Sequence, residues 1–333
     1  MTITKYFLGI KNIEQQNIDN IDFTSHLKTI MPEKNTFIAD PFLFKYEDSY
    51  YVFFELWDYN KGKIVCSKLD ENYNLTNIEL CLDLNYHLSF PCIFTYNNHI
   101  YMIPETNSQR CIKLFECIEF PTKWKFTKNL INNISAPDVS FFKYNDIIYL
   151  LTNNEDYLKI FYSNDLFGDF SSHSINNNSI KTNARNAGNI FIRDNMLYRP
   201  AQICSPSYGY GVALYKINKI STTEYDEELI KTYNPDWFPE LTGCHTFNIC
   251  DNLLITDGRL RIKSPNMKQV NSINGTVYKS TDNDEYTNNY ISNLCNNKLC
   301  NNEYINITNK WNSDNITNWY LTRNHIQNGE KKY

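Results

Sequence analysis

The chain repeats one pattern of apolar and polar residues five times. A short apolar run is followed by a polar turn and by a second apolar run rich in Tyr, Phe and Ile. This pattern predicts a β-hairpin, because β-branched and aromatic residues fit a pleated strand, while Asn and Asp accept the geometry of a tight turn. The copies are Leu43–Glu55, Ile93–Glu105, Phe141–Asn153, Ile190–Gln202 and Thr246–Gly258, of which the last is the weakest.

The spacing of the copies predicts a β-propeller. Successive copies begin 50, 48, 49 and 56 residues apart, and further strand-like segments follow each hairpin. A period near fifty with four strands per unit is typical of a propeller blade. We therefore expect an all-β, five-bladed β-propeller with four-stranded antiparallel blades over residues 1–270. A strand around Tyr6–Ile10 is expected to complete the last blade, and residues 271–333 to hold the rest of that blade and a polar, Asn-rich tail.

The composition argues against several classes of partner. The formal net charge is −5 and no block of Lys or Arg stands out, so we expect no nucleic-acid partner. No apolar run is long enough for a transmembrane segment, and no signal-peptide cleavage pattern is present. Most of the ten cysteines fall in predicted strands, which favours reduced thiols and a cytoplasmic location.

The motifs of the common cofactor and metal sites are missing. Cys295 and Cys300 have no second Cys pair or His partner at zinc spacing, so we expect no metal. The sequence also lacks a G-x-S-x-G motif, a Gly-rich phosphate loop and an HExxH motif, and no cofactor is expected.

Aligning the copies identifies candidate carboxylates. The positions three residues before each copy are Asp40, Phe90, Asp138, Ala187 and Gly243. In a propeller these positions begin the inner strands at the mouth of the central channel, so Asp40 and Asp138 are expected to face a shared cavity. Paired carboxylates suit sugar chemistry, in which one activates water and another tunes a pKa or protonates the leaving oxygen. The alternative is that each Asp only caps a turn.

The last position of each copy gives a second set of polar residues: Glu55, Glu105, Asn153, Gln202 and Gly258. Glu105 ends its strand in a Pro-Glu step that interrupts the strand ladder, and it is the stronger catalytic candidate. For Glu55 we favour a structural role in which it pairs with an Arg.

Further polar residues are expected on the same rim and could bind a substrate. Arg can hold a carboxylate or phosphate with two hydrogen bonds, and His can act near neutral pH or only donate a hydrogen bond. For each His alone, a structural role is the more common alternative. The candidates are His87, Ser89, Arg185, Arg199, Gln202 and His245.

Seven short motifs occur in an order that resembles a known family. They are Ala39-Asp-Pro-Phe, His87-Leu-Ser-Phe-Pro, Tyr101-Met-Ile-Pro-Glu, Phe161-Tyr-Ser-Asn-Asp-Leu, Arg185-Asn-Ala-Gly, Tyr198-Arg-Pro-Ala-Gln and Gly243-Cys-His-Thr-Phe-Asn. The sequence resembles the N-terminal five-bladed propeller domain of glucosamine inositolphosphorylceramide transferase-like proteins, and more distantly the family 43 type propeller glycosidases.

The resemblance implies roles for two carboxylates and also reveals a departure. Asp40 matches the general base of the family 43 enzymes, and Asp138 matches the residue that modulates a pKa there. The general acid of those enzymes is a Glu that enters blade four, but this chain has Arg185-Asn-Ala-Gly188 at that place. Glu105 or another group would have to supply the proton, or the reaction differs, or nothing is cleaved.

The sequence therefore leaves three hypotheses open. The first is an enzyme of glycan assembly or processing that acts on a glycan or nucleotide-sugar through Asp40, Asp138 and Glu105. The second is a non-catalytic carbohydrate-binding module that has lost the blade-four acid. The third is a propeller that only binds other proteins, for which the polar rim residues would not converge.

Overall fold

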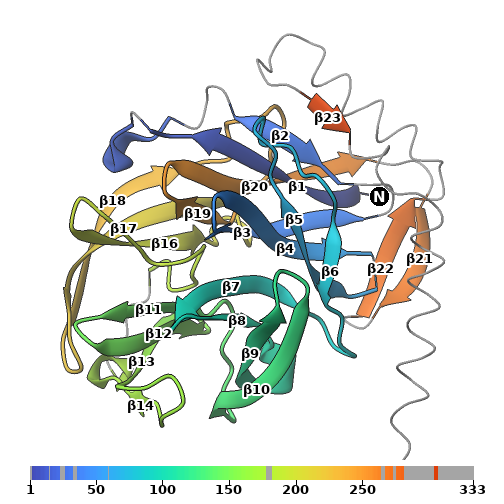
Figure 1. The fold of residues 1–333 in the computed structure, drawn as a ribbon. Coiled ribbons are helices and arrows are strands. Elements are labelled where there is room, and N and C mark those ends of the chain that lie inside the picture. Colours follow the sequence, from blue (N-terminus) through green and yellow to red (C-terminus); the bar gives the residue numbers. More distant parts are fainter. Residues whose placement is uncertain are drawn as a thin grey trace, which may run out of the picture.

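The protein is a five-bladed β-propeller in its computed structural model, as the hairpin repeat predicted (Figure 1). The structure describes residues 2–14, 16–22, 27–32, 36–58, 60–177, 182–263, 267–272, 275–280 and 304–306. Each blade is a four-stranded antiparallel sheet. The first strands of neighbouring blades lie side by side around the axis, as β3 does with β7 and β19.

Blades one to four follow one another along the chain. Blade one contains β3 (Phe37–Tyr46), β4 (Ser49–Trp57), β5 (Gly62–Lys68) and β6 (Glu79–Leu82). Blade two contains β7 (Ser89–Tyr96), β8 (His99–Glu105), β9 (Cys111–Glu119) and β10 (Lys123–Asn132). Blade three contains β11 (Ser140–Tyr144), β12 (Ile147–Asn154), β13 (Tyr157–Ser163) and β14 (Ser171–Ser172). Blade four contains β15 (Phe191–Arg193), β16 (Met196–Ile203), β17 (Gly211–Ile220) and β18 (Tyr225–Tyr233).

Blade five joins the two ends of the propeller. Its inner strands are β19 (Phe247–Cys250) and β20 (Leu253–Lys263), and its outer strands are β1 (Thr2–Asn12) and β2 (Lys28–Met31). β1 pairs with β20 over its whole length, which confirms that an N-terminal strand completes the last blade. A further strand, β23 (Tyr304–Asn306), pairs in parallel with β2, and β21 (Met267–Ser272) and β22 (Gly275–Ser280) form a separate hairpin. The other residues from 281 to 333, Cys295 and Cys300 among them, lie outside the described residues, and the division at residue 270 stays a prediction.

Tight two-residue turns connect the first two strands of every blade. Tyr46 faces Ser49 across the first turn, and Tyr96 faces His99 across the second. In the turns of blades two, three and four both central residues have a positive φ, which Asn and Asp tolerate better than most residues. These residues are Asn97 and Asn98, Asn145 and Asp146, and Asp194 and Asn195.

The strand register corrects the alignment of the fifth copy. Cys250 faces Leu253 across its turn, so the fifth copy begins at Phe247, one residue later than the sequence analysis placed it. The residue that corresponds to Glu55 and Glu105 is therefore Arg259 and not Gly258.

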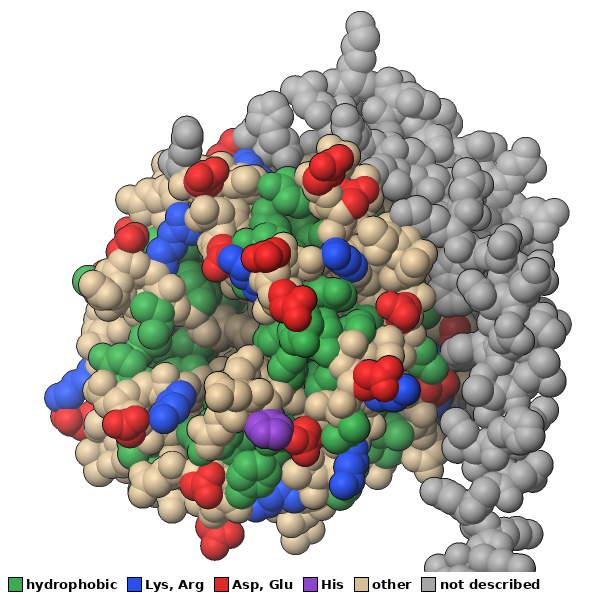
Figure 2. Space-filling model, viewed as in Figure 1, with side chains coloured by type: hydrophobic (Ala, Val, Ile, Leu, Met, Phe, Trp, Pro, Cys, Tyr) green, Lys and Arg blue, Asp and Glu red, His purple; other side chains and the backbone are tan. Residues whose placement is uncertain are grey.

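Apolar side chains fill the space within and between the blades. In one such cluster Phe42 of blade one contacts Phe90 of blade two, with ring centres 4.8 Å apart, and both are fully buried. On the face shown in Figure 2, acidic and basic side chains of the described residues are interspersed. The helices in the described part of the chain are 3₁₀ turns of three or four residues, too short to cross a membrane. The eight cysteines described form no disulfide, and the cytoplasmic location stays a prediction.

Candidate functional site

A cavity of about 410 Å³ opens where the first strands begin and the second strands end. Six predicted site residues line it, and they come from blades one, two, four and five. They are Asp40, His87, Ser89, Glu105, Arg185 and His245. Glu55 and four aromatic side chains, those of Tyr6, Phe37, Trp57 and Tyr208, complete most of the wall. The polar rim residues therefore converge, as the hypotheses of a sugar site require.

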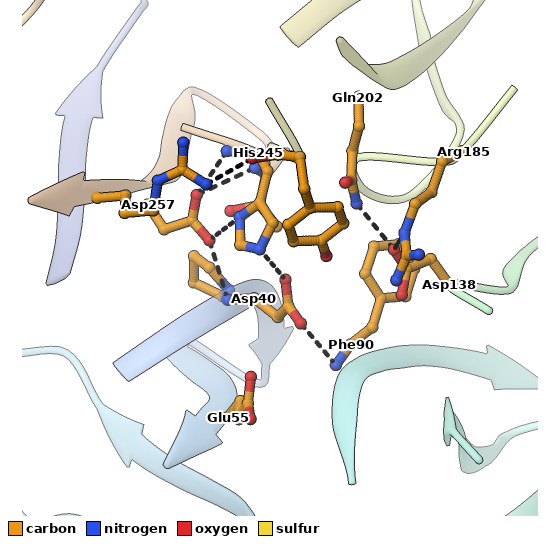
Figure 3. A network of polar contacts seen from close by, with 12 residues as sticks. Asp40, Glu55, Phe90, Asp138, Arg185, Gln202, His245 and Asp257 are labelled. Atoms are coloured by element: carbon orange, nitrogen blue, oxygen red, sulfur yellow. Dashed lines mark hydrogen bonds and ion pairs between the residues drawn. The ribbon is translucent and has the colours of Figure 1, made fainter. Parts of the chain in front are cut away.

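One side of the cavity holds a chain of three charged residues. His245 lies between two carboxylates, with Nδ1 2.6 Å from Oδ2 of Asp257 and Nε2 3.6 Å from Oδ1 of Asp40 (Figure 3). Asp257 Oδ1 also accepts hydrogen bonds from the backbone N–H groups of His245 (2.8 Å) and Thr246 (3.2 Å). Its Oδ2 lies 3.2 Å from the backbone nitrogen of Asp40, which donates to it. Asp257 thus fixes both the imidazole and the backbone of Asp40.

The environment shifts the pKa of each group in this chain. Burial raises the pKa of Asp40 to about 7, although the His245 charge opposes the shift. Burial alone would lower the pKa of His245, but the charges of Asp257 and Asp40 outweigh it and raise that pKa to about 9. Burial opposes ionisation of Asp257, but the His245 charge and the hydrogen bonds hold its pKa below the usual value. His245 is therefore a cation at neutral pH, held between the two carboxyl groups.

An unusual backbone conformation aims Asp40 at the cavity. Asp40, Phe90 and Asp138 occupy equivalent positions in blades one to three, and their φ angles are 50°, 44° and 49°. A positive φ is uncommon for residues other than Gly, although Asp tolerates it better than Phe, and such conformations occur at functional sites. The Phe90 backbone N–H donates to Oδ2 of Asp40 at 3.3 Å, so the neighbouring blade helps to hold the carboxyl group.

The other side of the network is centred on Asp138, which is 2% exposed. Its Oδ2 lies 2.5 Å from Nε of Arg185 and accepts a hydrogen bond from Nε2 of Gln202 at 2.8 Å (Figure 3). Gln202 also donates to the backbone carbonyl of Asn186, at 2.9 Å. Arg185 reaches into the cavity, whereas Asp138 and Gln202 lie behind it and set its position.

Glu105 reaches the cavity from the end of β8. Burial raises its pKa to about 7, and the negative charge of Asp138 adds to the shift. Its Oε1 accepts a hydrogen bond from the Asn107 backbone N–H at 2.9 Å. Glu105 therefore exchanges a proton near neutral pH, as a general acid or base must.

Glu55 pairs with a histidine and not with an Arg, contrary to the expectation from the sequence. Nε2 of His87 lies 3.5 Å from Oε1 of Glu55, which accepts no hydrogen bond from the described residues. Nδ1 of His87 accepts the Gly62 backbone N–H at 2.9 Å, so Nε2 carries the proton of the neutral ring. Burial raises the pKa of Glu55 and lowers that of His87, which favours the neutral forms of both.

Arg199 is not part of the cavity. Its guanidinium is fully buried in blade four, where Nε and Nη2 contact the two carboxylate oxygens of Glu227 at 2.7 and 2.6 Å. The hydroxyl of Tyr225 donates to the same carboxylate at 2.6 Å. The predicted substrate-binding role therefore has no support in this arrangement, because the charge is already paired inside the sheet.

Asp257 was not predicted, because it lies at neither of the two positions at which the copies were compared, the third residue before each copy and the last residue of each copy. In the corrected register, Asp257 occupies the position of Phe53, Ile103, Leu151 and Pro200 in the other blades, all apolar and buried. A carboxylate at a position that is apolar in every other copy is a signal that the sequence contains.

The chain of charged residues is also the place where a cation could bind. One ligand atom each from Asp40, His245 and Asp257 lies within 4.8 Å of the others. The close contact of Asp257 with Nδ1 of His245 already balances charge within this group. The expectation that the protein has no metal site stays a prediction.

Comparison with known proteins places the chain in a family. Residues 16–234 match the family model described as glucosamine inositolphosphorylceramide transferase 1, N-terminal. The chain belongs to this family. Glucosamine inositolphosphorylceramide transferase 1 from Oryza sativa subsp. japonica is 36% identical over 207 residues, which are 58% of this chain and 28% of the relative. The Arabidopsis thaliana protein of the same name is 32% identical over 58% of this chain and 27% of the relative.

The matched region spans little more than a quarter of the length of these relatives. The family model confirms the resemblance to the N-terminal domain of this family that the seven sequence motifs indicated. Among solved structures, Zg3597, a family 117 glycoside hydrolase from Zobellia galactanivorans, is similar in fold. Its TM-score is 0.50 at 10% identity, and the match covers 78% of this chain and 93% of that one.

Proposed function

We propose that the protein binds a glycan in the central cavity and cleaves or transfers a glycosidic bond there. The name of the relatives supports a carbohydrate-related function, since it includes a sugar and a transfer reaction. The cavity supports the same class of ligand, because its wall combines carboxyl groups with aromatic rings that can stack against a sugar.

The observation that carries the proposal is that Asp40 and Glu105 share one cavity and both have a pKa of about 7. At neutral pH one carboxyl group can therefore hold a proton while the other accepts one. In the proposed reaction Asp40 takes the proton of a water or acceptor hydroxyl as its oxygen attacks the anomeric carbon. Glu105 gives its proton to the leaving oxygen as the glycosidic bond breaks. Asp138 sets the field around both groups through Arg185.

Charge in the cavity favours a glycan over a nucleotide-sugar. Carboxyl groups of Asp40, Glu55 and Glu105 face the space, and Arg185 is already paired with Asp138. A diphosphate would meet these acids, whereas sugar hydroxyl groups can donate hydrogen bonds to them.

A second candidate function is a carbohydrate-binding module without catalysis. The specific observation in its favour is that the segment entering blade four carries Arg185 where the family 43 enzymes have their general acid. Such a module would keep the cavity and its affinity but would release its ligand unchanged.

A screen of neutral glycans and nucleotide-sugars with wild-type protein, Asp40→Asn and Glu105→Gln separates these functions. For an enzyme we expect both variants to keep binding within a few-fold and to lose turnover by about 100-fold or more. The matched control is Asp146→Asn, because this side chain is 98% exposed and does not line the cavity. Turnover should peak near pH 7, because the base must be ionised and the acid protonated. Binding without turnover by any form would identify the module, and the absence of any sugar binding would refute both functions.

A further inference from the structure

A second cavity lies beside the first. Its volume is about 380 Å³, close to the 410 Å³ of the central cavity. Arg185 and Tyr208 line both cavities, and Cζ of Arg185 lies 5.0 Å from the centre of the Tyr208 ring. These two side chains form a common wall, so a ligand in one cavity lies next to a ligand in the other.

One buried acceptor in the second cavity has no donor. Asn153, at the end of β12, lines this cavity and is 5% exposed. Its Nδ2 donates to the backbone carbonyl of Glu155 at 2.7 Å, which fixes the orientation of the amide. Its Oδ1 therefore points the other way, and it accepts no hydrogen bond from the described residues. A buried acceptor without a donor is unfavourable, and a ligand that donates a hydrogen bond would satisfy it.

The other polar groups of the second cavity define what it can bind. Glu155 and Asp156 contribute carboxylates, and Ser205 contributes a hydroxyl. The cation in its wall, Arg185, already pairs with Asp138. A phosphate would meet two negative charges and the oxygen of Asn153, whereas the hydroxyl groups of a neutral sugar can donate to all three.

The second cavity also contacts the residues that hold Asp138. Gln202 lines it, as Arg185 does, and both donate to Oδ2 of Asp138. A ligand in the second cavity would therefore contact Arg185 and Gln202, the two side chains that hold the Asp138 carboxylate beside the central cavity.

We propose that the second cavity is a subsite for a second, neutral sugar unit of the same glycan. The ligand is then at least a disaccharide, with one unit in each cavity and the link between them passing the Arg185–Tyr208 wall. This proposal rests on the proposed function, because it requires a sugar in the central cavity.

The test compares neutral disaccharides with their component methyl glycosides by titration calorimetry. The best disaccharide should bind at least about 10-fold more tightly than either component. Asn153→Ala should weaken disaccharide binding about 5-fold to 10-fold and leave binding of the component in the central cavity within about twofold. Asn154→Ala is the matched control, because Asn154 is the next residue of β12, is exposed and does not line the cavity.

A second readout uses the native protein and needs no variant. Cys204 is exposed and lines the second cavity, so its alkylation by iodoacetamide can be followed by peptide mass spectrometry. The disaccharide should slow this reaction, and a methyl glycoside that fills only the central cavity should not.

The possible results separate the two proposals. If methyl glycosides bind and Asp40→Asn affects turnover, but disaccharides bind no better and leave Cys204 reactive, the second subsite is refuted and the proposed function stands. Protection of Cys204 by inorganic phosphate as strong as by the disaccharide would also refute a neutral sugar subsite. If no saccharide binds at all, the proposed function itself fails.

Discussion

Blade four and the central cavity both bury charged side chains at hairpin positions that are apolar in blades one to three. Arg199 replaces the apolar residues found at Val52 and Met102, and Asp257 replaces those at Phe53 and Ile103. In blade four, Arg199 and Glu227 meet through two contacts, and the carboxylate also accepts the Tyr225 hydroxyl. That pair satisfies itself and needs no ligand.

In and directly behind the cavity, the buried acids that the structure describes outnumber the cations that interact with them. Asp40, Glu55, Glu105, Asp138 and Asp257 interact with one another electrostatically, against the two cations Arg185 and His245. The protein leaves this excess partly unpaired. Burial raises the pKa values of Asp40, Glu55 and Glu105, and the neighbouring negative charges add to the shift. A buried charge therefore indicates a binding site when the protein itself does not complete its pairing, and a structural role when it does.

The greatest loss of stability is expected when the buried pair of Arg199 and Glu227 is broken. Glu227→Ala leaves the buried Arg199 guanidinium without its counter-ion and should lower the free energy of unfolding by about 3–5 kcal/mol, measured by urea denaturation. The double variant Arg199→Met with Glu227→Leu should recover most of this loss, because no buried charge remains. Glu119→Ala, which breaks the exposed pair with Lys123, is the control and should cost less than about 1 kcal/mol. A similar small loss for Glu227→Ala would show that the buried pair is not structural.

The cavity should instead make stability depend on pH. Asp40 and Glu105 bind their protons more tightly in the folded chain, where each has a pKa of about 7, than in the unfolded chain. The stability that they contribute is complete below pH 4 and is lost as the pH rises to about 7, by about 2–4 kcal/mol for each group. His245, whose pKa rises to about 9, extends the decline from pH 6.5 to 9 by the same reasoning.

Urea denaturation at a series of pH values checks this decline. Asp40→Asn and Glu105→Gln should each flatten it between pH 4 and 7, whereas Asp146→Asn should keep the wild-type slope. A pH dependence that neither cavity variant changes would mean that folding does not raise the pKa values of these two carboxyl groups.

A smaller effect is expected from a glycine beneath the cavity. A Cβ on Gly62 would overlap the carbonyl oxygen of Leu88 and Oε1 of Glu55, and would lie 2.7 Å from Cε1 of His87. Gly62→Ala should therefore displace Glu55 and His87 and cost about 1–3 kcal/mol. Gly168→Ala is the matched control, because its Cβ would meet Oγ of Ser163 at 3.1 Å, a contact that a small shift relieves. Equal stability of the two variants would show that Glu55, His87 and the Leu88 carbonyl can move to accommodate the added methyl group at little cost.

Much of the fold could be predicted from the sequence because its signals are local. The alternation of apolar and polar residues predicted the hairpins, and Asn97 and Asn98 or Asp194 and Asn195 mark turns whose positive φ these residues accept. The period of about fifty then predicted five blades. The same alignment located Asp40 and Glu105, because equivalent positions of a propeller lie at the same end of the channel.

The alignment failed where the repeat is weakest. Thr246–Gly258 resembles the other copies least, and its register is wrong by one residue, so Gly258 was taken as the equivalent of Glu55 and Glu105 in place of Arg259. It also could not distinguish Arg185, which precedes the fourth hairpin, from Arg199, which lies in the second strand of that hairpin, since both carry the same charge. Their partners, Asp138 and Glu227, lie 47 and 28 residues away in the chain.

The blades, their turns and the end of the propeller at which the polar residues gather follow from the sequence alone. Periodicity and turn chemistry act over a few residues, so they can be read from the chain. Which charged residues contact one another depends on the three-dimensional fold. Asp40 and Asp257 are 217 residues apart, and they come into contact because β1 pairs with β20 and closes the ring. A pKa depends on burial and on charges within a few ångströms, so the chemistry of the cavity exists only after that closure.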